Sequence, residues 1–265
     1  MRWLTTHRRW LLGVVLLLTG MLAALAFVNR QAGEPRIIAT LPHDPNAYTQ
    51  GLLLHQNWFY ESTGQYGHSS LRRVEPGTGK VLQKINLPAT LFGEGLALVD
   101  DRLIQLTWRS GQAFVYDLTS FELLQEFRYD TEGWGLTYDG TQLIMSDGSH
   151  LLYFRDPHSF ALLRTLPVFD KGQPVRYLNE LEYIRGEVWA NVYRSPDIVR
   201  IDPGTGQVID RLRFPELPRP DERNGHEDVL NGIAYDASDN RLYITGKLYS
   251  YVYELNLAGI KFHRN

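Results

Sequence analysis

The sequence predicts an all-β fold, a five-bladed β-propeller, that follows one apolar N-terminal segment. The main observation is a short motif, a polar or aromatic residue followed by a Gly-Leu-like pair, which occurs five times. Each copy opens a short apolar stretch that ends in a turn, as expected for the strands of a repeated β unit. No stretch after Val28 keeps the 3.6-residue periodicity of an amphipathic helix, which argues against a helical solenoid.

The N-terminus is the clearest compositional boundary in the chain. Residues 1–9 carry three arginines, and residues 10–28 carry no charge. As a helix this run would rise about 28 Å, close to the hydrocarbon thickness of a bilayer. The basic flank favours a cytoplasmic N-terminus. We therefore expect a signal anchor or transmembrane helix over 10–28, a linker over 29–35 and an exported domain over 36–265.

A cleaved signal peptide is the alternative for the same segment, because Ala24-Leu25-Ala26 fits a small-x-small cleavage site. Either reading places the domain outside the cytoplasm, on the periplasmic side, membrane-anchored or secreted. The chain has no cysteine, which excludes disulfides, thiolate zinc sites and a cysteine nucleophile. Stability must therefore come from the core, which a chain of 265 residues can supply.

The repeat units divide the exported domain into blades. The five motifs begin at Gln50, Glu94, Trp134, Asn179 and Asn231, at intervals of 44, 40, 45 and 52 residues. A second strand is predicted in each unit, over Trp58–Ser62, Leu103–Thr107, Leu143–Ser146, Val188–Val192 and Leu242–Thr245. A third strand, a turn set by Pro or Gly and a fourth strand complete the unit. Four antiparallel strands in about 40 to 50 residues form a propeller blade.

The fifth unit lacks a fourth strand after Tyr251–Leu257. One predicted strand, Arg36–Leu41, lies before the first unit and is not assigned to any blade. We expect it to pair with the last blade and to close the ring, because closure removes an open sheet edge.

The repeat also predicts a functional site at one mouth of the central channel. If the first strand of each blade is innermost and starts at this mouth, the five motif residues form a ring there. The second strand returns to the same mouth and adds Gly64, Trp108, Gly148, Tyr193 and Lys247. The mouth would then hold one carboxylate, one ammonium group, several amides and several aromatic rings.

Each ring residue also has a structural interpretation. Asn231 could satisfy backbone groups at a strand start, Trp134 could belong to the core, and Lys247 could be a solvated surface lysine. Glu94 is harder to explain in this way, because two glycines flank it and leave room for a ligand to approach. Nearby aromatic residues would also remove water from its carboxylate, so Glu94 is the main catalytic candidate.

Eight short motifs between Ile37 and Glu254 lie in order and at blade spacing. They are Tyr48-Thr49-Gln50-Gly51-Leu52, Glu61-Ser62-Thr63-Gly64-Gln65-Tyr66-Gly67, Phe92-Gly93-Glu94-Gly95-Leu96, Gly133-Trp134-Gly135-Leu136, Leu178-Asn179-Glu180-Leu181-Glu182-Tyr183, Glu187-Val188-Trp189-Ala190-Asn191, Leu230-Asn231-Gly232-Ile233-Ala234 and Thr245-Gly246-Lys247-Leu248. Together they resemble the bacterial and plant glutaminyl-peptide cyclotransferases, a family of five-bladed propellers. Each motif alone is weak, but eight in order are specific.

The resemblance implies conversion of an N-terminal glutamine to pyroglutamate with release of ammonia. It implies that Glu94 is the proton shuttle, a task that needs a raised pKa, and that Lys247 and Asn179 stabilise the oxyanion. The expected substrate-binding residues are Tyr48, Gln50, Phe92, Trp108, Trp134, Tyr193 and Asn231. It implies no metal and no cofactor. Two positions depart from the family pattern: Tyr48 replaces the usual Phe, and Tyr193 stands where a Trp is expected, which bears on pocket size and substrate preference.

Two other function classes fit a propeller. A non-catalytic binding module would not need an isolated acid beside a cation. A metal-dependent hydrolase needs several oxygen ligands around a cation; Asn179 and Asn231 could ligate, but Glu94 is the one acid of the ring.

The expected partners are peptides or proteins with an N-terminal glutamine. The membrane is a further partner if the N-terminal helix is retained, and we expect a monomer. The formal net charge of −3, without a basic stripe, argues against nucleic acid.

Overall fold

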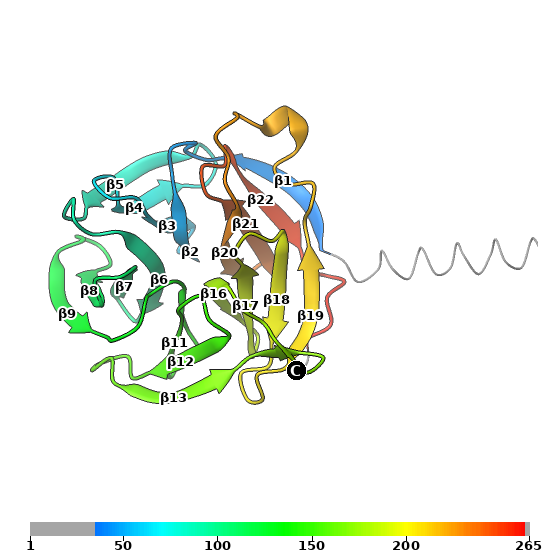
Figure 1. Ribbon diagram of the computed structural model, residues 1–265. Helices are drawn as coiled ribbons and strands as arrows, with labels where there is room; N and C mark the ends of the chain where they lie inside the picture. Colours follow the sequence, from blue (N-terminus) through cyan, green and yellow to red (C-terminus); the bar gives the residue numbers. More distant parts are fainter. Residues whose placement is uncertain (1–34, 263–265) are drawn as a thin grey trace, which may run out of the picture.

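Five four-stranded antiparallel sheets surround a central axis in residues 35–262, the part of the chain that the computed structural model describes (Figure 1). The predicted five-bladed propeller is therefore confirmed. The predicted basic flank and N-terminal helix, and all but the last residue of the predicted linker, lie outside the described residues. Within residues 35–262, no helix is long and apolar enough to span a bilayer.

Each blade runs from an inner to an outer strand. Blade 1 contains β2 (Thr49–His55), β3 (Trp58–Thr63), β4 (Ser70–Glu75) and β5 (Lys80–Asn86). Blade 2 contains β6 (Gly93–Val99), β7 (Arg102–Thr107), β8 (Gln112–Asp117) and β9 (Leu123–Arg128). Blade 3 contains β10 (Leu136–Tyr138), β11 (Leu143–Ser146), β12 (Leu151–Arg155) and β13 (Leu162–Pro167). Blade 4 contains β16 (Leu178–Ile184), β17 (Glu187–Val192), β18 (Asp197–Ile201) and β19 (Val208–Arg213).

Blade 5 contains β20 (Leu230–Asp236), β21 (Arg241–Gly246), β22 (Tyr251–Asn256) and β1 (Arg36–Pro42). β1 pairs antiparallel with β22, so the N-terminal strand closes the ring as predicted. Two short elements lie outside the blades: the hairpin of β14 (Phe169–Asp170) and β15 (Gln173–Pro174), and the 3-10 helix η1 (Pro220–Glu222).

The hydrophobic core consists of five clusters, one between each pair of neighbouring blades. Alternation along a strand sends successive side chains to opposite faces of the sheet. On β2, for example, Leu52 packs towards blade 5 beside Ala234, while Leu53 packs towards blade 2 beside Leu103. The continuous apolar runs of the inner strands are therefore explained, because both faces of each blade are covered.

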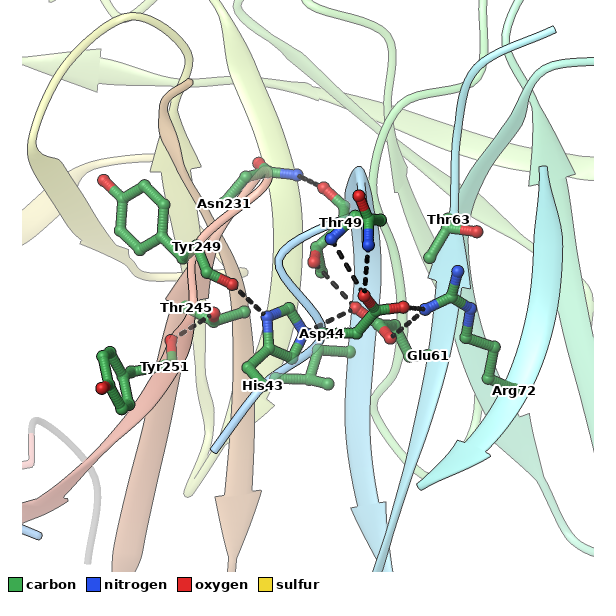
Figure 2. Close-up of polar contacts among 12 residues, drawn as sticks. His43, Asp44, Thr49, Glu61, Thr63, Arg72, Asn231, Thr245, Tyr249 and Tyr251 are labelled. Carbon is green, nitrogen blue, oxygen red and sulfur yellow. Dashed lines mark hydrogen bonds and ion pairs between the residues drawn. The ribbon is translucent and has the colours of Figure 1, made fainter. Parts of the chain in front are cut away.

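A buried ionic cluster joins the last blade to the first (Figure 2). His43 Nδ1 lies 2.7 Å from the carbonyl oxygen of Tyr249, and His43 Nε2 lies 2.9 Å from Glu61 Oε1. Both partners are acceptors when Glu61 is ionised, so both ring nitrogens donate and His43 is an imidazolium. Burial alone would lower the pKa of His43, but the Glu61 carboxylate raises it above its ordinary value. Thr49 on β2 donates to the same Glu61 oxygen at 2.8 Å.

The pairing of the two inner strands shifts register at the channel mouth in four blades. The shifts fall at Gln50, at Glu94 and Gly95, at Asn179 and Glu180, and at Asn231 and Gly232. Such bulges redirect side chains and are common next to active sites. Blade 3 differs, because β10 begins only at Leu136, after the Trp134-Gly135 pair that was predicted to open its inner strand. There Trp134 N donates to Ser146 O and Ser146 N donates to Gly135 O, both at 3.0 Å, and the Ser146 hydroxyl also accepts from Gly135 N at 2.8 Å.

The glycines of the motif allow the inner strands to approach each other closely. A Cβ atom at Gly95 would lie 2.5 Å from Leu136 N of the next blade, a distance that no side chain tolerates. Blade 4 has Glu180 at this position, and its carboxylate accepts from the N–H groups of Leu52 at 3.2 Å and Ile233 at 2.8 Å. Glu180 therefore links blade 4 to blades 1 and 5.

Candidate active site

Nine of the ten residues predicted for the site line one cavity of about 200 Å³ at the channel mouth. The lining residues are Tyr48, Gln50, Phe92, Glu94, Trp108, Trp134, Asn179, Tyr193 and Lys247. They come from all five blades, because each inner strand begins, and each second strand ends, at this mouth. The tenth residue, Asn231, is fully buried and does not line the cavity.

Glu94 stands on the bulge of β6 and is 5% exposed. Gln50 Nε2 donates to Glu94 Oε1 at 3.2 Å. Burial raises the pKa of the Glu94 carboxyl well above its ordinary value, the Lys247 ammonium opposes this shift, and the charge of Glu132 adds to it. A carboxyl group with a raised pKa can both accept and return a proton near neutral pH.

Lys247 is buried rather than solvated, with 4% of its surface exposed. The interpretation as a surface lysine is therefore wrong. Its Nζ lies 4.9 Å from the ring centroid of Tyr48 and 5.1 Å from that of Tyr193. Burial lowers the pKa of Lys247, while Glu94 and Asp228 oppose this effect. The two aromatic faces give the ammonium group some of the stabilisation that water would otherwise supply.

The aromatic walls are built by edge-on contacts. Phe92 lies 6.1 Å from Tyr48 and 5.5 Å from Trp108 between ring centroids, and Trp134 lies 5.6 Å from Tyr193. All three contacts have the T-shaped geometry that aromatic rings prefer. The rings of the walls therefore support one another.

Two glycines at the ends of second strands make room for these walls. A Cβ atom at Gly64 would lie 2.3 Å from the Phe92 ring, and one at Gly148 would lie 2.6 Å from the Trp134 ring. The repeat therefore places a glycine where a neighbouring aromatic ring covers the strand end.

The two asparagines of the ring have different surroundings. Asn179 lines the cavity, and its side-chain oxygen makes no hydrogen bond with any other described residue. Asn231 instead lies behind Gln50, and its Nδ2 donates to Thr49 O at 3.0 Å and to Gln50 Oε1 at 3.3 Å. Asn231 thereby turns the nitrogen of the Gln50 amide towards Glu94. This placement favours a role for Asn231 in orienting Gln50 rather than the predicted direct contact with a substrate.

Glu132 is a site residue that the sequence reasoning missed. Its Oε2 accepts from Trp108 Nε1 at 2.8 Å and from Trp134 Nε1 at 3.0 Å. Its Oε1 accepts from Arg109 at 2.9 Å, and that guanidinium lies 3.8 Å above the Trp108 ring. Partial burial opposes ionisation, but these donors lower the pKa of Glu132 below its ordinary value. The signal was present in the repeat, because Glu132 precedes Trp134 by two residues, as Phe92 precedes Glu94.

Asp228 is a second residue that the sequence did not indicate. It ends the segment Pro215 to Asp228 before blade 5, and it accepts from the Tyr48 hydroxyl at 2.8 Å. Its backbone N–H donates to Lys247 O at 3.0 Å. The hydroxyl that Tyr48 adds relative to the expected Phe therefore points to Asp228.

The surroundings of Glu94 are amides, aromatic rings and an ammonium group. Among residues 35–262, no three His, Asp or Glu side chains gather closely enough to form a metal-ligand set. Of the described residues, Glu94 is the one carboxylate that lines the cavity. A buried acid with a raised pKa beside a buried ammonium group, in a small aromatic pocket on a propeller, is characteristic of an enzyme that couples proton transfer to polarisation of a polar group.

The chain belongs to the glutamine cyclotransferase family, whose model matches residues 12–257. It is 43% identical over 234 residues to the glutaminyl-peptide cyclotransferase of Arabidopsis thaliana, which covers 87% of this chain and 73% of that protein. The crystal structure of Myxococcus xanthus glutaminyl cyclase is similar with a TM-score of 0.79 and 38% identity, covering 84% of this chain and 95% of that chain. The family resemblance drawn from the motifs is therefore confirmed.

Proposed function

We propose that this protein is a glutaminyl-peptide cyclotransferase, which converts the N-terminal glutamine of peptides to pyroglutamate and releases ammonia. Family membership supports this activity. The observation that assigns it to specific residues is the burial of Glu94 and Lys247 in one cavity. The cavity of about 200 Å³ is smaller than the pockets of roughly 300–1,000 Å³ that bind drug-sized ligands. This size suits one glutaminyl group.

In the proposed reaction the α-amino nitrogen of the substrate attacks the carbon of its own side-chain amide. Glu94 takes a proton from this nitrogen as the new N–C bond forms. It then returns the proton to the amide nitrogen as the old C–N bond breaks, so that ammonia leaves. One carboxyl group serves both steps because its raised pKa makes both of its forms accessible.

The amide oxygen gains negative charge in the tetrahedral intermediate. Lys247 and Asn179 are the groups proposed to stabilise it, because both are buried and line the cavity with Glu94. Donors that are held in place before the reaction need no reorganisation as charge develops. Asn179 would act through its side-chain N–H₂ group, because an amide nitrogen donates hydrogen bonds and an amide oxygen only accepts them.

The assay is ammonia release from a Gln-initiated dipeptide by the purified protein. We expect turnover by the wild type and a loss of about 10²- to 10⁴-fold in kcat for the Glu94→Gln variant. Glu126→Gln on the exposed face of β9 is the matched control and should be unaffected. Absence of ammonia with every Gln-initiated peptide would refute the activity, and near-normal turnover by folded Glu94→Gln would refute the shuttle.

We also propose that the propeller works outside the cytoplasm, tethered by an uncleaved segment over residues 10–28. The basic flank and the uncharged run support this location. Alkaline phosphatase fused after residue 265 should be active in cells only if the C-terminus is exported. N-terminal sequencing of the isolated protein distinguishes a retained segment from cleavage after Ala26.

A further inference from the structure

Two exposed tyrosines flank the cavity and have no part in the chemistry above. Tyr66 is 52% exposed and Tyr177 is 56% exposed. All other Phe, Tyr and Trp side chains of residues 35–262 are buried or partly buried. An exposed aromatic ring is stabilised when another apolar group covers it. Exposed rings at the opening of a site therefore indicate a place where a ligand can bind.

Tyr66 continues the aromatic wall of the cavity outward. Its ring centroid lies 5.4 Å from that of Phe92, in a T-shaped contact, and Phe92 lines the cavity. The turn that carries Tyr66 is fixed on both sides, because Gly67 N donates to Ala89 O at 3.0 Å and Ser69 N donates to Gln65 O at 2.9 Å. The ring is therefore presented to solvent by a rigid segment.

Tyr177 occupies in blade 4 the position of Tyr48 in blade 1 and Phe92 in blade 2, two residues before the ring residue. The backbone contacts are equivalent. Tyr48 O accepts from Gly64 N, Phe92 O accepts from Trp108 N, and Tyr177 O accepts from Tyr193 N, at 2.8 to 2.9 Å. Tyr48 and Phe92 line the cavity, whereas the Tyr177 side chain is exposed to solvent.

The backbone of Tyr177 has φ +66, in the left-handed region that bulky residues rarely adopt. It is held there from both sides, because Tyr177 N donates to Gly148 O at 2.8 Å and Tyr177 O accepts from Tyr193 N at 2.9 Å. Gly148 lies beneath the Trp134 ring, and Tyr193 lines the cavity. Strain that the surrounding structure maintains in this way is typical of functional positions.

We propose that Tyr66 and Tyr177 form a subsite for the peptide residues that follow the N-terminal glutamine, with a preference for aromatic or large apolar side chains. This inference rests on the proposed function. The cavity has room for the glutaminyl group alone, so the rest of the peptide must leave across the rim. There it meets two rigid aromatic faces, from blades 1 and 4, whose exposed surface a planar apolar side chain covers best.

The test compares kcat/KM for three substrates, Gln-Gly-NH₂, Gln-Phe-NH₂ and Gln-Gly-Phe-NH₂. We expect the wild type to prefer at least one phenylalanine peptide over Gln-Gly-NH₂ by about three- to tenfold, mainly through KM. Tyr66→Ser and Tyr177→Asn should reduce this preference and leave turnover of Gln-Gly-NH₂ unchanged. Asparagine is chosen at position 177 because it tolerates the left-handed backbone. Tyr66→Phe and Tyr177→Phe should keep the preference.

Leu124→Ser is the matched control, because Leu124 is equally exposed, at 52%, but lies on the outer strand β9. The proposal is overturned if the variant that combines Tyr66→Ser and Tyr177→Asn keeps the wild-type preference, or if it loses activity equally on all three peptides. A wild type that releases no ammonia from any of the three peptides would instead refute the underlying activity, and the subsite with it.

Discussion

Lys247 carries an ammonium group that has little access to water. Burial lowers its pKa, and two tyrosine faces at about 5 Å contribute to its stabilisation. A cation in this setting interacts strongly with a charge that appears beside it, because water does not screen the pair. The contribution of Lys247 should therefore appear in the transition state, where the oxyanion forms, rather than in substrate binding.

Lys247→Ala should lower kcat by about 10²- to 10³-fold with a smaller change in KM, as for loss of an oxyanion donor. Steady-state ammonia release measures both constants. Lys80→Ala, at the exposed start of β5, is the control and should behave as the wild type. An unchanged kcat in folded Lys247→Ala would rule out the oxyanion role.

Glu132 holds both tryptophan walls through one oxygen and also affects Glu94 through its charge. Activity should rise with pH as Glu94 loses its proton and becomes a base. Glu132→Gln removes a negative charge that raises the pKa of Glu94, so this acid limb of the kcat profile should move to lower pH. KM should rise severalfold as the indoles loosen. If KM rises while the acid limb stays in place, Glu132 acts only as a structural support.

At the scale of the strands, the repeat determined how much of the site could be predicted. Motif spacing indicates where each inner strand begins, and this was sufficient to bring Glu94, Asn179 and Lys247 to one mouth. Spacing does not determine how a bulge turns a side chain, so Asn231 was placed at the cavity although it points to Gln50. The burial of Lys247 was also unpredictable, because the tyrosines around it come from blades 1 and 4.

The junction between blades 1 and 5 depends on the buried ion pair of His43 and Glu61. The pKa of His43 is raised above its unfolded value, so the stability that the pair contributes is complete below about pH 6.5. It is lost as the pH rises through the raised value. The pKa of Glu61 is lowered despite burial, so the pair is also lost as the pH falls through that value.

His43→Gln should lower the free energy of unfolding at pH 6 by about 2–4 kcal/mol, because buried Glu61 keeps its charge but loses its nearest cation and retains, among the described residues, only Arg72, at 3.8 Å. The variant should also lose less stability than the wild type between pH 6 and pH 9. Urea denaturation at both pH values measures the two effects, with exposed His68→Gln as the control. Parallel pH profiles for wild type and His43→Gln would contradict an imidazolium at this position.

At the scale of the whole molecule, the ring of five blades encloses a central channel, and the channel contains acidic groups that are costly to ionise. Glu94, Glu180 and Glu182 all lie on inner strands, and burial raises the pKa of each. Glu180 and Glu182 link blades through backbone N–H groups, whereas Glu94 faces the cavity. A carboxyl group with a raised pKa binds its proton more tightly in the folded state, so folding stability falls as the pH rises through the range between the unfolded and folded values.

Glu182 allows this effect to be tested away from the active site. Its pKa is raised from 4.5 to about 8, and its oxygens accept from Tyr235 N at 3.1 Å and Thr137 Oγ1 at 3.3 Å. Glutamine can keep the first bond through its oxygen and carries no charge at any pH. Glu182→Gln should therefore resemble the wild type near pH 5 and exceed its unfolding free energy at pH 8.5 by about 1–3 kcal/mol. A constant difference between pH 5 and 8.5, measured by urea denaturation against Glu126→Gln, would mean that Glu182 is already ionised in the folded protein at pH 5.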